Sequence, residues 1–159
     1  MTDDAASQRS ARLERFSTGF AAVADALDGA DDGDLDRRGP SGEWSAREIA
    51  HHLADSESMT YVRLRRLIAE DEPVIAGYDE PEWARRLHYE RPIETSLEVL
   101  QAVRGASQQL LMTLTPDEWE RRGTHSESGE YSVDDWLEIY SEHSHEHADQ
   151  IRRARRGED

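Results

Sequence analysis

Four long segments of this chain repeat apolar residues every three or four positions, which is the period of an amphipathic helix. No stretch of five residues or more alternates apolar and polar side chains as a half-buried strand does. The pattern therefore predicts an all-α fold, a four-helix bundle in a single domain over residues 1–159. We expect its helices at about residues 10–28, 45–70, 95–114 and 132–155.

Capping signals indicate where three of these helices begin. Ser45 and Glu48 have the spacing of a capping box, in which each side chain hydrogen-bonds to the other residue's backbone N–H. Thr95 and Glu98 have the same spacing, and Ser132 precedes the last helix in the same way. These signals predict helices that begin just after residues 45, 95 and 132.

The connections between the helices are long, so a simple up-and-down bundle with tight loops is not required. Residues 28–40 are rich in Gly and Asp, and residues 123–130 also have turn composition, so both predict loops. Residues 73–92 are bracketed by prolines and rich in aromatic side chains. This segment predicts a structured crossover that contains one short helix, and long crossovers of this kind often carry function.

Composition narrows the classes of partner. The formal net charge is −16, which disfavours binding to nucleic acid or to an anionic membrane surface. The chain has no apolar run long enough for a membrane span, and its first residues do not resemble a signal peptide. We therefore expect a cytoplasmic protein that acts on a small molecule.

The chain contains no cysteine and no lysine. A disulfide, a nucleophilic thiol and a Schiff-base lysine are therefore excluded, and a metal ion could bind only to His, Asp or Glu. Two explanations for the acidic, lysine-free composition stay open. One is high-GC coding, and the other is adaptation to high salt, where a dense acidic surface keeps a protein solvated.

The histidines are grouped in two of the predicted helices. His143 and His147 are about 40° apart on a helix and share the apolar stripe, whereas His145 points about 200° away from His143. Of the neighbouring pair His51 and His52, the second is nearer the apolar side of its helix. His52, His143 and His147 are therefore predicted to converge inside the bundle.

Three neutral imidazoles with an open fourth position are typical of a catalytic site for Zn or Ni. The alternative is three core histidines that are satisfied by hydrogen bonds. The other four histidines are expected to be solvated or to support the ligands from behind. They are His51, His88, His125 and His145.

The sequence resembles the DinB-like superfamily, and within it the YfiT-like branch of metal-dependent hydrolases and bacillithiol S-transferases. The resemblance rests on residues 44–56, on residues 73–83 and on residues 140–150. Within the first segment the matching run is Ile49-Ala50-His51-His52-Leu53-Ala54-Asp55-Ser56.

The resemblance implies a four-helix bundle with long crossovers, frequent homodimerisation, and a divalent metal held by His52, His143 and His147. It also implies that the open metal position takes water or an external low-molecular-weight thiol. The crossover residues Tyr78, Asp79 and Trp83 then become candidates for a wall of the substrate pocket, with anchoring of the loop as the alternative role.

Three functions remain open at this stage. The first is a metal-dependent transferase that conjugates a low-molecular-weight thiol to a small electrophile. An anionic thiol would then need local arginines such as Arg63, Arg85 or Arg86, because the net charge would repel it.

The second function is a metal-dependent hydrolase whose general base is Asp55, Glu57 or Glu142. The third is a non-catalytic protein that binds a metal or a small ligand under stress.

Overall fold

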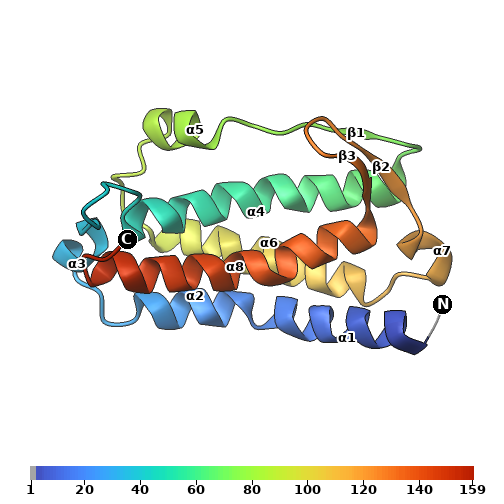
Figure 1. Cartoon of the computed structure of the whole chain (residues 1–159), viewed down its shortest axis with the longest axis horizontal. Coiled ribbons are helices and arrows are strands. Elements are labelled where there is room, and N and C mark those ends of the chain that lie inside the picture. Colours follow the sequence, from blue (N-terminus) through green and yellow to red (C-terminus); the bar gives the residue numbers. More distant parts are fainter. Residues whose placement is uncertain (1–2) are drawn as a thin grey trace.

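The computed structural model describes residues 3–159, and helices dominate it (Figure 1). In chain order the elements are α1 (Asp3–Ser17), α2 (Gly19–Leu27), α3 (Asp32–Asp36), α4 (Ala46–Ala69), β1 (Val74–Ile75), α5 (Glu80–Arg86), α6 (Glu94–Leu111), α7 (Pro116–Trp119), β2 (Arg122–His125), β3 (Gly129–Ser132) and α8 (Val133–Arg155). None of the helices in the described part combines the length and apolar composition needed to cross a membrane.

The long helices form the predicted all-α four-helix bundle. Helix α8 packs against α4 and against both α1 and α2, while α6 packs against α4. Figure 1 shows α1 and α2 following one another along one side of the bundle, with the crossover and α5 running over α4. The capping boxes at Ser45 and Ser132 form as expected, and each starts its helix at the next residue.

The first predicted helix is in fact two helices, because the helical conformation is interrupted at Thr18. Arg104 Nη2 donates to the main-chain oxygen of Phe16 at 2.9 Å. In an unbroken helix this oxygen would accept from an N–H one turn later. A Cβ atom on Gly19 would lie only 2.5 Å from Arg104 Nη2. Glycine at this position therefore lets the backbone approach the Arg104 side chain.

Helix α6 begins one residue earlier than expected and ends at Leu111 rather than at residue 114. Its N-cap is Ile93, which makes no capping hydrogen bond through its side chain. The predicted capping box at Thr95 and Glu98 is therefore wrong, because both residues lie inside the helix.

The predicted loop at 123–130 is a β-hairpin. Strands β2 and β3 pair antiparallel, and β1 from the crossover pairs parallel with β2. A Cβ on Gly123 would lie 2.3 Å from the main-chain oxygen of Pro73, so glycine permits this close approach. Strands of two to four residues are too short to show an alternating pattern, and this small sheet ties the crossover to the start of α8.

Two further contacts anchor the segments that flank α4. In the predicted loop 28–40, the short helix α3 carries Asp32 and Asp36, and both pair with Arg47. Beyond α5, which is the short helix expected in the crossover, Tyr89 donates to Asp55 Oδ2 at 2.6 Å. The crossover is therefore fixed to the first half of α4.

The apolar core consists of two clusters along the bundle. One is centred on Val23, Ile49, Leu53, Leu100 and Ile151, and the other on Phe16, Leu64, Leu111, Trp136 and Leu137. Between them along α4, α6 and α8 lie the buried polar residues Glu57, Arg104 and Ser144. The polar layer between the two clusters is where the histidines converge.

Candidate metal centre

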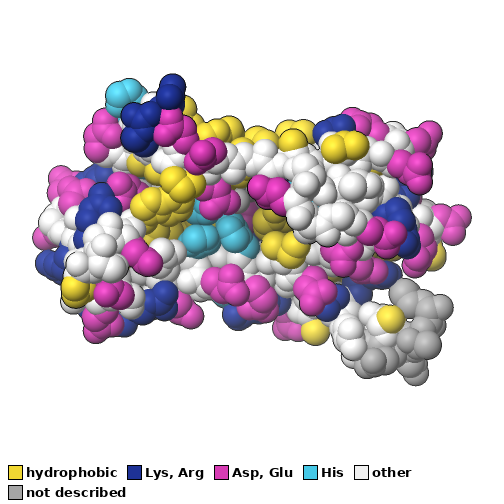
Figure 2. Space-filling view, turned by 45° about the horizontal axis from the view of Figure 1, so that its top comes forward, with side chains coloured by type: hydrophobic (Ala, Val, Ile, Leu, Met, Phe, Trp, Pro, Cys, Tyr) yellow, Lys and Arg dark blue, Asp and Glu magenta, His cyan; other side chains and the backbone are white. Residues whose placement is uncertain are grey.

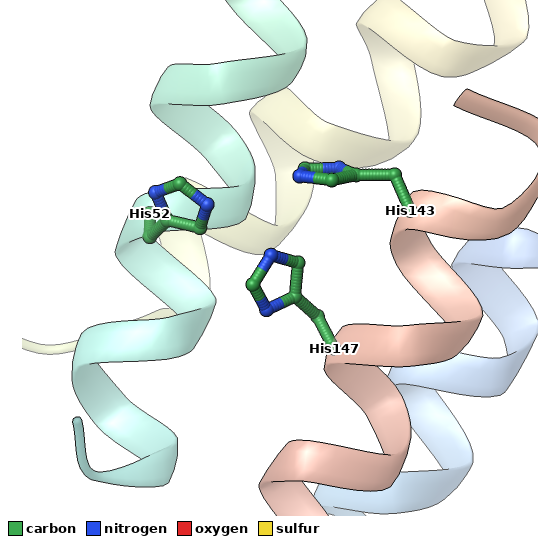
Figure 3. Close-up of side chains that lie close together, drawn as sticks. All are labelled: His52, His143 and His147. Atoms are coloured by element: carbon green, nitrogen blue, oxygen red, sulfur yellow. The ribbon is translucent and has the colours of Figure 1, made fainter. Parts of the chain in front are cut away.

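Three histidines from two helices face one another across the boundary between α4 and α8. One ring nitrogen from each of His52, His143 and His147 lies within 4.8 Å of the others, a spacing that could hold a metal ion. Figure 3 shows a nitrogen of each ring turned toward the space between them. The structure thus brings together the three residues that helical phase predicted.

The helices position these side chains for simple reasons. His143 and His147 are one turn apart on α8, and their rings meet nearly at right angles with centroids 4.6 Å apart. His52 stands on the second turn of α4 after the capping box, and its ring contacts that of His147 at 4.8 Å. Trp44, which precedes the cap, packs on the other side of His52 with ring centroids 4.7 Å apart.

Burial keeps two of these imidazoles neutral. Burial, together with the neighbouring His147 and His143, lowers the pKa of His52 to about 3. Burial also lowers the pKa of His147 to about 4, with His143 as the next cause. Because a metal binds the neutral form of imidazole, these two rings are already in their binding state near pH 7.

His147 has a partner that fixes its ring. Its Nδ1 lies 2.8 Å from Oε1 of Gln150, one turn along α8. An amide oxygen is an acceptor, so Nδ1 carries the proton and Nε2 keeps the lone pair that a metal needs. Sequence reasoning missed Gln150, although its spacing of three residues from His147 could have indicated this contact.

His143 differs from His147 because its Nδ1 is buried without a hydrogen-bond partner in the described part of the chain. Oε1 of Glu57, an acceptor, lies 3.7 Å away. Burial raises the pKa of Glu57, but Arg104 and His143 outweigh this effect and hold the pKa below its usual value. Glu57 is therefore a buried carboxylate directly behind a candidate ligand.

Next to His143 along the bundle lie a tyrosine, Tyr140, and an arginine, Arg63, that is hydrogen-bonded to it. The ring of Tyr140 meets that of His143 with centroids 5.7 Å apart, and its hydroxyl accepts from Arg63 Nη1 at 3.0 Å. Arg63 also donates to the main-chain oxygen of Ala76, and its Nε is buried without a hydrogen-bond partner among the described residues. The guanidinium therefore lies one tyrosine ring away from the histidines.

The three crossover residues proposed for the pocket wall make different contacts. Tyr78 packs against Trp83 with ring centroids 4.4 Å apart, and burial raises the pKa of Tyr78 to about 12. Its hydroxyl is buried and has no hydrogen-bond partner among the described residues. Asp79 instead caps α5 by accepting from Glu82 N at 3.0 Å. The structure therefore gives Asp79 a clear structural role.

The surface above the histidines is hollowed. Figure 2 shows histidine side chains at the bottom of this hollow, with hydrophobic side chains on both sides and acidic groups around the rim. The histidine side chains at the bottom of the hollow are exposed on this face, which leaves room for a small molecule to approach.

The other histidines lie away from this centre. His51 was expected to be solvated or to support the ligands, but it is fully buried, with its ring nitrogens 2.8 Å from Ser96 Oγ and from the Arg91 oxygen. It ties α4 to α6 and the crossover. His145 contacts the Arg15 oxygen on α1 at 2.9 Å. His88 is exposed beside Glu90, and His125 packs against Tyr131 in the hairpin.

Comparison with known proteins agrees with this arrangement. Residues 15–151 match the model of the DinB superfamily. The chain belongs to this superfamily. A relative from Oceanobacillus iheyensis, provisionally named a metal-dependent hydrolase, is 42% identical over 113 residues, which is 71% of this chain and 66% of the relative. YfiT of Bacillus subtilis, named in the same way, is 34% identical over 118 residues, covering 73% of this chain and 66% of YfiT.

The solved structure of Bacillus subtilis YfiT superposes with a TM-score of 0.87 and 28% identity, covering 98% of this chain and 89% of that one. It is described as a probable metal-dependent hydrolase with an unusual four-helix bundle topology. In sequence, however, the matched segment spans slightly less than two thirds of the curated relatives named above, at 66% of each. The chain thus shares the DinB family and the four-helix bundle fold of YfiT. The names of the relatives, which describe metal-dependent proteins, are consistent with the histidine cluster.

Proposed function

We propose that this protein binds a divalent metal ion, zinc or nickel, through His52, His143 and His147, and that it transfers a low-molecular-weight thiol to a small electrophile. The observation that carries the proposal is the convergence of three imidazole nitrogens within 4.8 Å at the bottom of an open hollow. Structural zinc sites are closed by four protein ligands, whereas catalytic sites keep one position open.

The donor set fits such an ion. Imidazole nitrogens suit zinc and nickel, and burial already keeps His52 and His147 in the neutral form that binds metal. The hydrogen bond between His147 and Gln150 directs Nε2 of this ring into the shared space. When bound, the ion supplies Lewis acidity that lowers the pKa of a thiol or water in the open position.

The thiol must come from outside, since the chain contains no cysteine. In the proposed reaction the thiol loses its proton to solvent water, its sulfur bonds to the electrophilic carbon, and the displaced group leaves with the bonding electron pair. Arg63 supports an anionic thiol, because its guanidinium donates to Tyr140 and its Nε has no hydrogen-bond partner among the described residues. Arg85 and Arg86 do not serve this purpose, because both pair with Glu82 on the surface of α5.

Hydrolysis is the second candidate, and the names of the relatives favour it. It requires a group that takes a proton from water. The three carboxylates considered for that role have other partners: Asp55 accepts from Tyr89, Glu57 pairs with the buried Arg104, and Glu142 pairs with Arg15 on the surface. Each of the three carboxylates is therefore already engaged, and we place hydrolysis second.

The test uses untagged protein loaded with zinc or nickel. We would incubate it with an anionic thiol and chlorodinitrobenzene, and in parallel with a nitrophenyl ester and no thiol. Conjugate formation that is lost in His52→Ala supports the proposal, while metal-dependent ester cleavage without thiol replaces it with hydrolysis. Metal binding with neither activity would leave a non-catalytic binding protein and would overturn the enzymatic proposal.

A further inference from the structure

A buried ion pair lies directly behind one of the candidate ligands. Glu57 on α4 is 2% exposed and Arg104 on α6 is 3% exposed, and Arg104 Nη1 lies 2.5 Å from Glu57 Oε1. Arg104 also donates to the main-chain oxygens of Phe16 and Tyr140, so it joins α1, α4, α6 and α8 at one level of the bundle. The carboxylate is thus held in place by a side chain that is itself fixed.

The same carboxylate oxygen faces α8. Glu57 Oε1 lies 3.7 Å from His143 Nδ1 and 3.5 Å from Ser144 Oγ. His143 Nδ1 is buried and has no hydrogen-bond partner in the described residues. A buried ring nitrogen without a partner costs free energy, and Glu57 Oε1, at 3.7 Å, is an acceptor that could relieve this cost.

We propose that Glu57 is a positioning residue of the metal centre: its Oε1 accepts the Nδ1–H of His143 and thereby leaves Nε2 of this ring as the ligand atom. The inference rests on the proposed metal binding at His52, His143 and His147. A small rotation of the His143 ring toward Glu57 closes the distance, and the fixed carboxylate then determines the ring's tautomer and orientation.

The arrangement repeats that of His147 with a different acceptor. His147 has the neutral amide oxygen of Gln150 behind it, whereas His143 has a carboxylate. A charged acceptor forms a stronger hydrogen bond and makes the ring a better electron donor. Glu57 therefore contributes more to metal affinity than Gln150 does.

Glu57 could act on the metal site through its hydrogen bond to His143, or only stabilise the fold through its ion pair with Arg104. Paired substitutions separate these two roles. Replacing both partners of a buried ion pair with apolar residues of similar size is often neutral for stability, while removing one partner is costly. The double variant Glu57→Met/Arg104→Met therefore removes the acceptor for His143 without leaving a buried charge. The double variant Glu57→Gln/Arg104→Met also removes the charges but keeps an oxygen that can accept.

The experiment measures Zn²⁺ affinity by competition with a chromophoric chelator in the full-length protein, together with the absorption spectrum of the Co²⁺ form. We expect the Met/Met variant to bind Zn²⁺ about 10- to 100-fold more weakly than the wild type and to change the Co²⁺ spectrum. The Gln/Met variant should recover part of the affinity. The matched control is Arg12→Gln/Glu138→Gln, which removes a surface ion pair between α1 and α8 and should bind as the wild type does.

Each outcome decides between the proposals. Wild-type affinity and an unchanged Co²⁺ spectrum in a folded Met/Met variant would overturn the role of Glu57 and leave the metal site standing. Equal loss in the Met/Met and Gln/Met variants would also overturn it, because the loss would then not depend on the acceptor. A wild-type protein that binds no divalent metal would overturn both proposals. In the Zn²⁺ form, a slowly exchanging Nδ1 proton on His143 in nitrogen-15 NMR spectra supports the inference, and its absence contradicts it.

Discussion

The imidazole rings of His52 and His147 meet edge to face, with centroids 4.8 Å apart, although they come from helices far apart in the sequence. Two such rings in a shared buried space repel each other when both are protonated. Their contact therefore disfavours protonation of both rings, and the neutral pair is also the state that a metal requires.

The helical phase of α8 predicts which of its histidines bind metal. His143→Ala should reduce bound zinc or nickel to well below one ion per chain, because it removes one of three converging nitrogens. His145→Ala should keep the wild-type metal content, since His145 contacts the Arg15 oxygen on α1. Elemental analysis of the two variants checks this, and an equal loss of metal in both would contradict the assignment.

Acid should destabilise the metal-free protein through His52. Its pKa is lowered from 6.5 to about 3 in the folded state, so as the pH falls below 6.5 the unfolded chain takes up a proton first. The stability that His52 contributes is present above pH 6.5 and is lost progressively as the pH falls toward 3.

Urea unfolding in the presence of a chelator at pH 7.5 and at pH 5.5 measures this effect. The wild type should lose about 1.4 kcal/mol more than His52→Gln, because the unfolded chain carries the extra proton mainly over the one pH unit below 6.5, and one unit corresponds to about 1.4 kcal/mol for one proton. Carboxylates titrate alike in both proteins, so the comparison isolates His52. Parallel pH dependence in the two proteins would exclude this account.

Two glycines should respond to alanine in opposite directions. Gly19→Ala places a Cβ 2.5 Å from Arg104 Nη2 and should destabilise the protein by about 1–3 kcal/mol. Gly105→Ala on α6 meets no atom within 4 Å and should stabilise it by about 0.5–1 kcal/mol. Thermal unfolding of both variants checks the prediction. A neutral Gly19→Ala would mean that the close approach of α2 to Arg104 is not required.

Arg63 should distinguish anionic from neutral thiols. Arg63→Gln keeps a side chain that can donate to Tyr140 but removes the positive charge. We expect KM for an anionic thiol to rise about tenfold, which corresponds to about 1.4 kcal/mol, while KM for an uncharged thiol stays constant. Steady-state kinetics with the two thiols measures the difference. An equal effect on both thiols would remove the proposed electrostatic role.

The sequence predicted most of the bundle because its long helices have strong local signals. The apolar stripes and the capping boxes at Ser45 and Ser132 placed α4 and α8 correctly, and with them the phase of His52, His143 and His147. What local patterns missed depends on contacts between distant segments. The break at Thr18 accompanies the insertion of Arg104 from α6, and the hairpin β2–β3 pairs with a strand from the crossover.

The supporting residues of the site were harder to predict than its ligands. Glu57 has the appearance of an ordinary helix carboxylate in the sequence, and only its pairing with Arg104 makes it a buried group. Trp44 directly precedes the N-cap Ser45, and its packing on His52 depends on how the chain enters α4. His51 was expected to be solvated or to support the ligands, because helical angles cannot show that the crossover covers it.

The most direct test of the account is elemental analysis of untagged protein, purified without chelator, alongside His52→Ala. His52 is the single candidate ligand from α4, so its removal leaves only the pair on α8. The account predicts close to one zinc or nickel ion per wild-type chain and a large loss in the variant. A wild-type protein that holds no divalent metal even after incubation with Zn²⁺ and Ni²⁺, or a variant that keeps its full complement, would contradict it.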